Sequence, residues 1–207
     1  MEKIAEYEIT NRVPKYSGKF KIEELTIKTG GKEFKTEVFN RGHSVGALVY
    51  NTETKKYLFT EQYRAGAEGM MIEIVAGKME EGEKTQEAIK REIVEEIGYK
   101  ADKIVHITDF YLSPGGSSEV MALFYVEVSE KIGEGGGVDE TENINIIEVE
   151  DLGLNGNMFF EFPESGDVTP PYKLIDAKSL IAVSWYVQNK MMKSLWETVS
   201  EFKMKSL

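Results

Sequence analysis

Hydrophobic and polar residues alternate along the first 40 residues of the chain. The runs FKIEELTIKT (residues 20–29) and KEFKTEVFN (residues 32–40) have the period of two that is typical of β-strands with one buried face. The glycine pair between them predicts a hairpin, and IAEYEIT (residues 4–10) is a candidate third strand. A sheet of three strands has little core of its own, so we expect residues 1–41 to form a small antiparallel sheet that packs on something else.

The middle of the chain combines strand patterns with one helical pattern. Strand candidates lie at residues 44–51, 56–64, 71–75, 103–113, 120–130 and 144–150. Between the third and fourth of them, residues 84–97 predict a helix, and Gly98 directly after it is a typical C-cap. Strands mixed with helices predict an α/β layered fold for residues 42–207.

The C-terminal part begins with a segment rich in Gly, Pro and Asn. This segment, residues 151–173, predicts a long surface loop. Asp176 then has the position of an N-cap before a long helix. We expect one face of that helix to lie in the core, and this face carries Ile181, Trp185, Met192, Trp196 and Val199.

The composition excludes several classes of functional site and says less about the fold. With 207 residues and 41% hydrophobic residues, the chain suits one domain, or one domain with a small appendage. Its net charge of −11 disfavours attraction to nucleic acid or to anionic membranes, so an anionic substrate needs local Arg, Lys or bound metal. The absence of cysteine excludes disulfides, thiolate zinc sites and cysteine nucleophiles. No apolar run has the length of a membrane span, and charged residues interrupt MEKIAEYEIT, so we expect a cytoplasmic protein without a signal peptide.

The predicted helix at residues 84–97 is unusually acidic. Glu92 lies three and four residues before Glu95 and Glu96, and like charges at this spacing destabilise a helix. The adjoining side can bury the helix against a sheet, because it carries Ile89, Ile93 and Ile97. The carboxylates then lie at the edge of the buried face. Dense glutamate oxygens in such a place suit hard cations such as Mg²⁺ or Mn²⁺.

A solvated charged face is the ordinary interpretation of a helix rich in glutamate. Three features weigh against it here. Only Lys90 and Arg91 lie nearby to compensate the acids, and a loop bounded by Gly77 and Gly82 leads into the helix. An apolar strand feeds that loop, so backbone carbonyls could face a metal as well.

The spacing of the residues around this helix matches a known signature. The pattern G-x5-E-x7-R-E-U-x-E-E-x-G-U, with U aliphatic or aromatic, resembles the Nudix hydrolases, and it is met by Gly77, Glu83, Arg91, Glu92, Ile93, Glu95, Glu96, Gly98 and Tyr99. Tyr99 at the final position is a mild departure. The resemblance implies an α/β/α sandwich with a mixed sheet. It also implies Mg²⁺-dependent cleavage of a nucleoside diphosphate linked to another group, with Mn²⁺ as the alternative ion.

The same resemblance gives roles to the matching positions. It implies that Glu92 and Glu96 are the principal metal ligands, with the Ala76 carbonyl as a backbone ligand. Glu95 would be an additional ligand with a part in catalysis. The residues expected to support the site are Gly77, Glu83 and Arg91, with Glu83 and Arg91 paired to orient the loop on the helix.

Flanking segments resemble the branch of the ADP-ribose and GDP-mannose pyrophosphatases, over about residues 20–190. NRGHSVGALVYN and EQYRAG precede the box, YLSPGGSSE and GGGVDETENINIIEV follow it, and IDAKSLIAVSWYV resembles the final helix of that branch. Pro114, 15 residues after Tyr99, resembles the mark of the ADP-ribose type. The resemblance implies ADP-ribose as substrate, with GDP-mannose or another nucleoside diphosphate sugar nearly equal. A nucleotide sensor without hydrolysis is a remote alternative, because such sensors usually lose the box glutamates.

Several residues outside the box are candidates for substrate contact. Arg41 and Arg64 are associated with strands and could reach phosphates, to which Arg can donate two parallel hydrogen bonds. Glu119, after the PGGSS turn, could accept hydrogen bonds from a base or ribose, and Gly115 and Gly116 of that turn belong to the same candidate site. Without the box, ordinary surface ion pairs would be the preferred interpretation of these charges.

The acidic segment VDETEN follows a run of glycines. In the branch that it resembles, a mobile loop here carries the catalytic base; Glu140 aligns best with that base, and Glu142 is the nearby alternative. Gly133 and residues 135–137 are expected to give the loop freedom to close. The N-terminal sheet of this branch exchanges between two subunits, so the resemblance also implies a homodimer.

Overall fold

The computed structural model describes residues 6–138, 143–150, 152 and 176–205. Within these residues the chain forms two compact units. The first combines the described residues of Met1–Ser44 with Asp109–Met121, and the second combines Val45–Thr108 with the described residues of Ala122–Leu207. Nearly all of the predicted loop at 151–173 lies outside the described residues, and its one described residue, Leu152, is buried.

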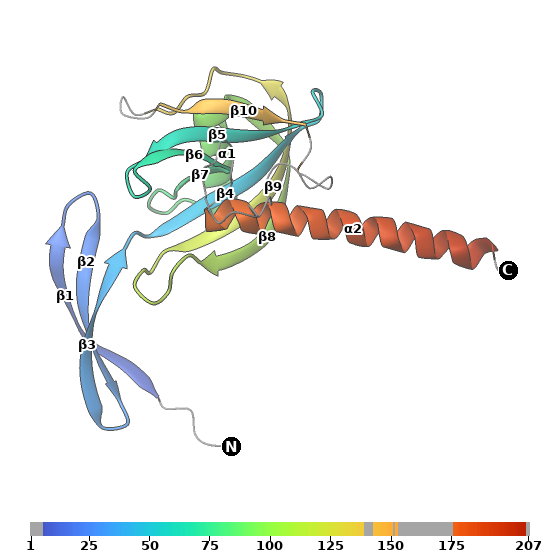
Figure 1. Cartoon of the computed structure of the whole chain (residues 1–207). Coiled ribbons are helices and arrows are strands. Elements are labelled where there is room, and N and C mark those ends of the chain that lie inside the picture. Colours follow the sequence, from blue (N-terminus) through green and yellow to red (C-terminus); the bar gives the residue numbers. More distant parts are fainter. Residues whose placement is uncertain (1–5, 139–142, 151, 153–175, 206–207) are drawn as a thin grey trace, which may run out of the picture. The chain divides into compact units, whose positions relative to one another are not determined.

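The first unit contains the antiparallel sheet that the alternating pattern predicts. Its strands are neighbours in space in their chain order, β1 (Tyr7–Ser17), β2 (Lys21–Thr29) and β3 (Lys32–Asn40) (Figure 1). Gly30 and Gly31 form the turn between β2 and β3 with φ angles of 53° and 77°, a conformation that glycine adopts without steric cost. Among the described residues of these strands, only Leu25 and Thr26 are buried, as expected of a sheet with little core of its own.

The second unit is built on a seven-stranded sheet. Its strands are β4 (His43–Asn51), β5 (Lys56–Arg64), β6 (Gly69–Glu73), β7 (Val75–Lys78), β8 (Tyr99–Tyr111), β9 (Val120–Lys131) and β10 (Asn145–Val149). Five of them follow the order β10-β5-β4-β9-β8, while β6 pairs with β5 and β7 pairs with β4. The single strand predicted at residues 71–75 is therefore wrong, because the chain changes its pairing partner at Ile74.

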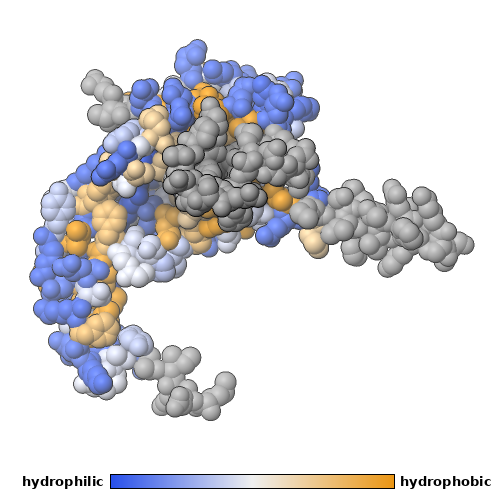
Figure 2. Space-filling view, viewed as in Figure 1, coloured by the Kyte–Doolittle hydropathy of each residue, from blue (hydrophilic) through white to orange (hydrophobic). Residues whose placement is uncertain are grey.

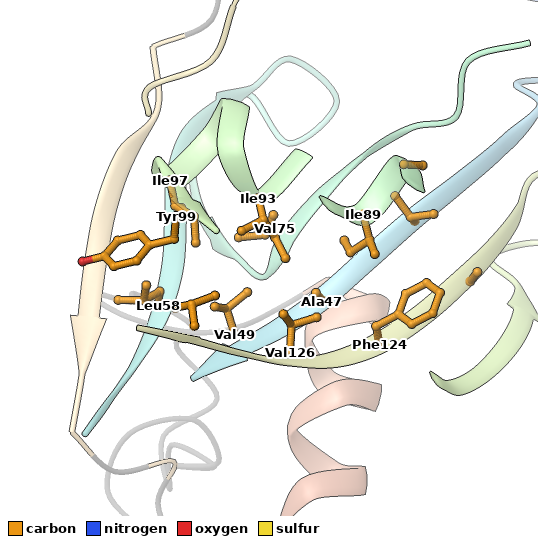
Figure 3. Packing of buried hydrophobic residues seen from close by; sticks show 14 residues of the cluster. Ala47, Val49, Leu58, Val75, Ile89, Ile93, Ile97, Tyr99, Phe124 and Val126 are labelled. Atoms are coloured by element: carbon orange, nitrogen blue, oxygen red, sulfur yellow. The ribbon is translucent and has the colours of Figure 1, made fainter. Parts of the chain in front are cut away.

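Helices cover both faces of this sheet. α1 (Thr85–Ile97) lies on one face and α2 (Ala177–Lys205) on the other (Figure 3). The isoleucines of α1 point onto a layer of buried side chains that includes Ala47, Val49, Leu58, Phe124 and Val126. Each fully buried isoleucine contributes roughly 2 kcal/mol, so α1 is held firmly on the sheet. The three layers are those of the predicted α/β/α sandwich.

The N-terminus of α2 lies where the sequence predicts it. Asp176 directly precedes the helix, and its Oδ1 accepts a hydrogen bond from the Ser179 N–H at 3.1 Å, as an N-cap does. Neither α1 nor the described part of α2 is at once long enough and apolar enough to cross a bilayer.

The predicted core face of α2 is wrong. The side chains that α2 buries are Lys178, Ser179, Ala182 and Val183. Ile181 and Trp185 are only half-buried, and Met192 is 66% exposed. The side chains of Trp196 and Val199 lie outside the described part of the chain. Apolar periodicity failed here because two of the buried positions carry polar residues that have partners of their own.

Candidate metal and substrate site

The acidic helix carries two of its glutamates on its buried side. Glu92 is 8% exposed and Glu96 is 6% exposed, although both are charged residue types. They lie one turn apart on α1, so both side chains leave the same side of the helix, against which β7 packs. Glu95 lies further toward solvent, with 26% of its side chain exposed.

Arg91 binds three glutamates at once. Its Nε and Nη2 donate to the two carboxylate oxygens of Glu83, each at 3.0 Å. Its Nη1 donates to Glu92 at 2.7 Å and to Glu95 at 2.9 Å, and Nη2 also donates to the Lys78 carbonyl at 3.0 Å. These hydrogen bonds from Arg91 hold the pKa of Glu83 below its ordinary value. One guanidinium thus offsets much of the repulsion in the acidic cluster and ties the preceding loop to the helix.

Glu96 forms no ion pair among the described residues. Its Oε2 accepts a hydrogen bond from the Ala76 N–H at 3.1 Å. Burial raises the pKa of Glu96 to about 8, and the charges of Glu92 and Glu73 add to the rise, while the Ala76 hydrogen bond and the charge of Arg64 oppose it. A buried carboxylate with this balance of charges gains more from a nearby cation than an exposed one does.

Gly77 leaves the space that the Glu92 carboxylate occupies. A Cβ at position 77 would lie 1.9 Å from Glu92 Cδ and 2.0–2.1 Å from its oxygens. Oxygen donors of this kind, beside the backbone of residues 76–77, fit a hard divalent cation. Among the described residues no three acidic or histidine side chains converge on one point, because Glu92 and Glu95 direct oxygens to Arg91.

The glycine run after β9 packs on the C-terminal end of α1. Two of its N–H groups donate to carbonyls of the helix, from Gly136 to Glu96 at 2.9 Å and from Gly137 to Glu95 at 3.0 Å. Gly135 has a φ of 74°, and a Cβ on it would lie 2.7 Å from the Glu96 carbonyl oxygen. The sequence predicts these glycines as a source of loop freedom, whereas the structure uses them for close backbone contact.

A second cluster of charges lies at the start of α2, and of its members only Arg64 was predicted as part of the site. Glu73 is 4% exposed and accepts hydrogen bonds from Arg64 Nε and from Lys178 Nζ. Lys178 Nζ also donates to Asp176 Oδ1 at 2.9 Å. Two features of the sequence could have indicated this cluster. They are Glu73, a charged residue inside the apolar run MIEIV, and Lys178, a lysine at the start of an apolar helix.

The first unit brings Arg41 and Glu119 together. Arg41 Nη1 lies 3.5 Å from Glu119 Oε2, and the guanidinium carbon lies 5.7 Å from the centre of the Phe20 ring. Glu119 is 6% exposed, while about half of the Arg41 side chain is exposed. A cation above an aromatic ring, beside a carboxylate, is suited to polar and stacking contacts with a ligand.

The PGGSS turn is joined to the end of β3. Gly115 and Gly116 are exposed, and the Gly116 carbonyl accepts a hydrogen bond from the Phe39 N–H at 2.8 Å. The other candidate residues for catalysis, Glu140 and Glu142, lie outside the described residues.

A family model describes the pattern that these residues follow. The model of the NUDIX domain matches residues 40–167, which is more than half of the chain and contains the whole box. The chain belongs to the NUDIX family. The resemblance drawn from the sequence is therefore confirmed, and the acidic helix is the helix of a Nudix box.

Relatives of this Nudix chain include two kinds of named pyrophosphatase. The GDP-mannose pyrophosphatase of Cronobacter sakazakii (strain ATCC BAA-894) is 34% identical over 135 residues, which cover 61% of this chain and 70% of that protein. The ADP-ribose pyrophosphatase of Bacillus subtilis (strain 168) is 34% identical over 128 residues, 62% of this chain and 68% of that protein. The GDP-mannose pyrophosphatase of Salmonella arizonae (strain ATCC BAA-731 / CDC346-86 / RSK2980) is 30% identical over 178 residues, 82% of this chain and 86% of that protein.

The fold is shared with solved structures as well. A crystal structure of an ADP compounds hydrolase superposes with a TM-score of 0.68 over 93% of this chain and 98% of that chain. The sequence identity is 17%, so the likeness is one of fold. The predicted Nudix α/β fold with a small N-terminal sheet is confirmed.

Proposed function

We propose that this Nudix protein hydrolyses the pyrophosphate bond of a nucleoside diphosphate sugar, with ADP-ribose as the first candidate, giving AMP and ribose 5-phosphate. The observation that carries the proposal is the placement of Glu92 and Glu96, buried one turn apart on the Nudix helix beside Gly77. Burial of carboxylates costs free energy unless a cation or hydrogen bonds compensate. Glu96 has no ion-pair partner among the described residues, and its described hydrogen bond is the one from the Ala76 N–H, which supports a role for its charge in function.

The residues proposed to hold the cation are Glu92, Glu96, Glu95 and the Ala76 carbonyl. Carboxylate and carbonyl oxygens are the donors that Mg²⁺ and Mn²⁺ prefer. When bound, the ion would neutralise charge on the pyrophosphate and make water a stronger nucleophile at neutral pH. The hydrogen bond from the Ala76 N–H to Glu96 holds the backbone at residue 76 next to this carboxylate.

The chain's other candidate residues would bind the substrate and move the proton. Arg64 offers donors to phosphate oxygens, and the pair of Arg41 and Glu119 offers polar contacts to the nucleoside or sugar. Glu140, or Glu142 in its place, would accept the proton from the attacking water. The hydrogen bonds of the glycine run to α1 support this role, because they hold Gly136 and Gly137, directly before the acidic segment, against the helix that carries the other carboxylates.

GDP-mannose is the second candidate substrate. The relative with that name in Salmonella arizonae matches 82% of this chain, a larger share than the ADP-ribose pyrophosphatase of Bacillus subtilis matches. The two substrates share the pyrophosphate and differ in base and sugar, so the same carboxylates would serve both.

A substrate panel tests the proposal. Purified protein with Mg²⁺ is given ADP-ribose, GDP-mannose, UDP-glucose and dinucleoside polyphosphates, and the nucleotide products are separated by chromatography. The proposal expects AMP from ADP-ribose, or GMP from GDP-mannose, at a rate well above those of the other compounds. Equally slow hydrolysis of the whole panel would contradict the substrate class, and binding without any hydrolysis would favour the sensor.

We also propose that the protein is a homodimer that exchanges or shares its N-terminal sheet. Apolar side chains on β1 and β3 support this, because Tyr7, Ile9, Tyr16 and Phe34 are 45–66% exposed. Figure 2 shows hydrophobic residues lying among hydrophilic ones on the visible surface of this sheet. Light scattering is expected to give twice the chain mass of 23.4 kDa. A mass of one chain would contradict the dimer without affecting the proposed chemistry.

A further inference from the structure

The buried carboxylate of Glu73 lies between two cations. One oxygen, Oε2, accepts a hydrogen bond from Arg64 Nε, and the other, Oε1, accepts one from Lys178 Nζ. Only 5% of the Glu73 side chain and 10% of the Lys178 side chain are exposed, so both charges are largely removed from water. Arg64 is more open, with 35% of its side chain exposed. Hydrogen bonds between ionised groups in such surroundings are among the stronger ones in proteins.

The start of α2 is tied to the end of β6 and to Ile74, which directly precedes β7. Asp176 Oδ1 accepts hydrogen bonds from Lys178 Nζ and from the Ser179 N–H. Ser179 Oγ accepts a hydrogen bond from the Ile74 N–H at 2.9 Å. Residues 73 and 74, directly before β7, are thus held by side chains that lie 105 positions further along the chain.

Each carboxylate oxygen of Glu73 binds a different cation, and this determines which nitrogen of Arg64 binds Glu73. A carboxylate can accept two parallel hydrogen bonds from one guanidinium, and this is its preferred arrangement with arginine. Here Lys178 takes one oxygen, so Arg64 is bound through Nε. Among the described residues no side chain or carbonyl accepts a hydrogen bond from the Arg64 Nη atoms, which leaves them available to an anionic ligand.

We propose that Lys178 is a positioning residue of the active site. By occupying one oxygen of Glu73, it keeps Arg64 bound through Nε and its Nη atoms directed to the phosphates of the substrate. This inference rests on the proposed function for the part that concerns the substrate. It adds the N-terminus of α2 to the site, a role that neither the Nudix box nor its spacing indicates.

The charges of the cluster support a role beyond packing. Arg64 and Lys178 balance Glu73 and Asp176, so the cluster has no net charge. Loss of Lys178 would leave one excess negative charge beside a site that must accept an anion. It would also free Glu73 Oε1 to bind a second nitrogen of Arg64. Both changes act on substrate affinity rather than on the chemical step.

A double-mutant cycle between Lys178 and Arg64 tests the proposal. Lys178→Met is expected to raise the KM of the preferred substrate about tenfold with kcat little changed, since a charge-assisted hydrogen bond is worth about this factor. In the Arg64→Ala background, Lys178→Met is expected to raise KM by clearly less than tenfold, because only the effect of the excess negative charge remains. Lys178→Arg, which keeps a cation for Glu73, is expected to restore most of the affinity. Lys190→Met, on the exposed side of the same helix, is the matched control and is expected to behave as wild type.

Three results would overturn the inference. They are an unchanged KM in Lys178→Met, an equal rise in KM in both backgrounds, and a loss of kcat without any change in KM. If Lys178→Met does not fold, Lys178→Leu replaces it, because Leu also removes the donor to Glu73 Oε1. If wild type hydrolyses neither ADP-ribose nor GDP-mannose, the proposed function fails by itself. A crystal structure of the Lys178 variant then decides the inference: two nitrogens of Arg64 on Glu73 support it, and an unmoved guanidinium contradicts it.

Discussion

The carboxylate of Glu92 fills the place where residue 77 would carry a side chain. A Cβ at position 77 would lie 1.9 Å from Glu92 Cδ, far inside van der Waals contact. The obstructing atoms are the end of a flexible side chain, so Gly77→Ala is expected to displace the carboxylate rather than unfold the protein. Because a displacement of about 1 Å in a catalytic group can cost on the order of 100-fold, turnover should fall by about that factor while the melting temperature changes little.

Gly66→Ala is the matched control for this substitution. A Cβ at Gly66 meets no heavy atom within 4 Å, and its φ is not positive. Turnover and melting temperature of this variant are expected to equal those of wild type. Full activity in Gly77→Ala would show that the position of the Glu92 carboxylate does not matter for the reaction.

Glu96→Gln is expected to change activity and stability in opposite directions. Burial raises the pKa of Glu96 from the ordinary 4.5 to about 8, so the folded state holds the proton more tightly than the unfolded state. Wild type therefore loses stability through this group as the pH rises from about 4.5 to about 8, and the Gln variant does not. In EDTA at pH 8, Glu96→Gln is expected to melt at a higher temperature than wild type, yet to lose about 100-fold or more in turnover with Mg²⁺. Thermal melts at pH 5 and pH 8 measure the first effect; a variant less stable than wild type at pH 8 would contradict it.

Arg91 is expected to support the fold as well as the site. Its guanidinium donates to three glutamates and a carbonyl, so Arg91→Met should lower the free energy of unfolding by about 2 kcal/mol or more, as loss of several charge-assisted hydrogen bonds does. The hydrogen bonds from Arg91 lower the pKa of Glu83, so the stability from this pair is present at neutral pH and lost as the pH falls below the ordinary value of 4.5. Urea titrations at pH 7 and pH 4 measure both effects. The exposed neighbour in Lys90→Met serves as control, and equal stability of the two variants would contradict the role of Arg91.

The catalytic base is a prediction from sequence alone. If Glu140 accepts the proton from the attacking water, Glu140→Gln should lower kcat by about 10²–10⁴-fold, as loss of a general base does. KM should stay nearly unchanged. Glu142→Gln is the matched comparison in the same segment. Steady-state kinetics of the two variants assign the base to the one that loses kcat. Wild-type kinetics in both would exclude the segment from the chemistry.

The sequence predicted the local parts of the site well because its signals are local. The helix expected at residues 84–97 is α1, Thr85–Ile97, and Gly98 closes it with a φ of 74° and an N–H that donates to the Val94 carbonyl. The hairpin at Gly30 and Gly31 is likewise a matter of adjacent residues and their permitted φ angles.

The rest depends on residues that are far apart in the chain. The link between Glu73 and Lys178 spans 105 positions, and periodicity gives no reason to bury a lysine on α2. The same limit explains the wrong core face of α2 and the unforeseen contact of Gly135 with the end of α1. Long-range pairs of this kind are determined by how the elements pack, which a single sequence does not state.

Binding of Mn²⁺ is the most direct test of the carboxylate site on which the proposed function depends. Electron paramagnetic resonance reports free Mn²⁺, so a titration into chelator-treated protein counts the ions that bind, and Mg²⁺ should displace them. We expect wild type to bind at least one ion per chain and the Glu92→Gln, Glu96→Gln double variant, shown to be folded by circular dichroism, to bind none at the same concentrations. Undiminished binding by the double variant, or no binding by wild type, would contradict the proposed site.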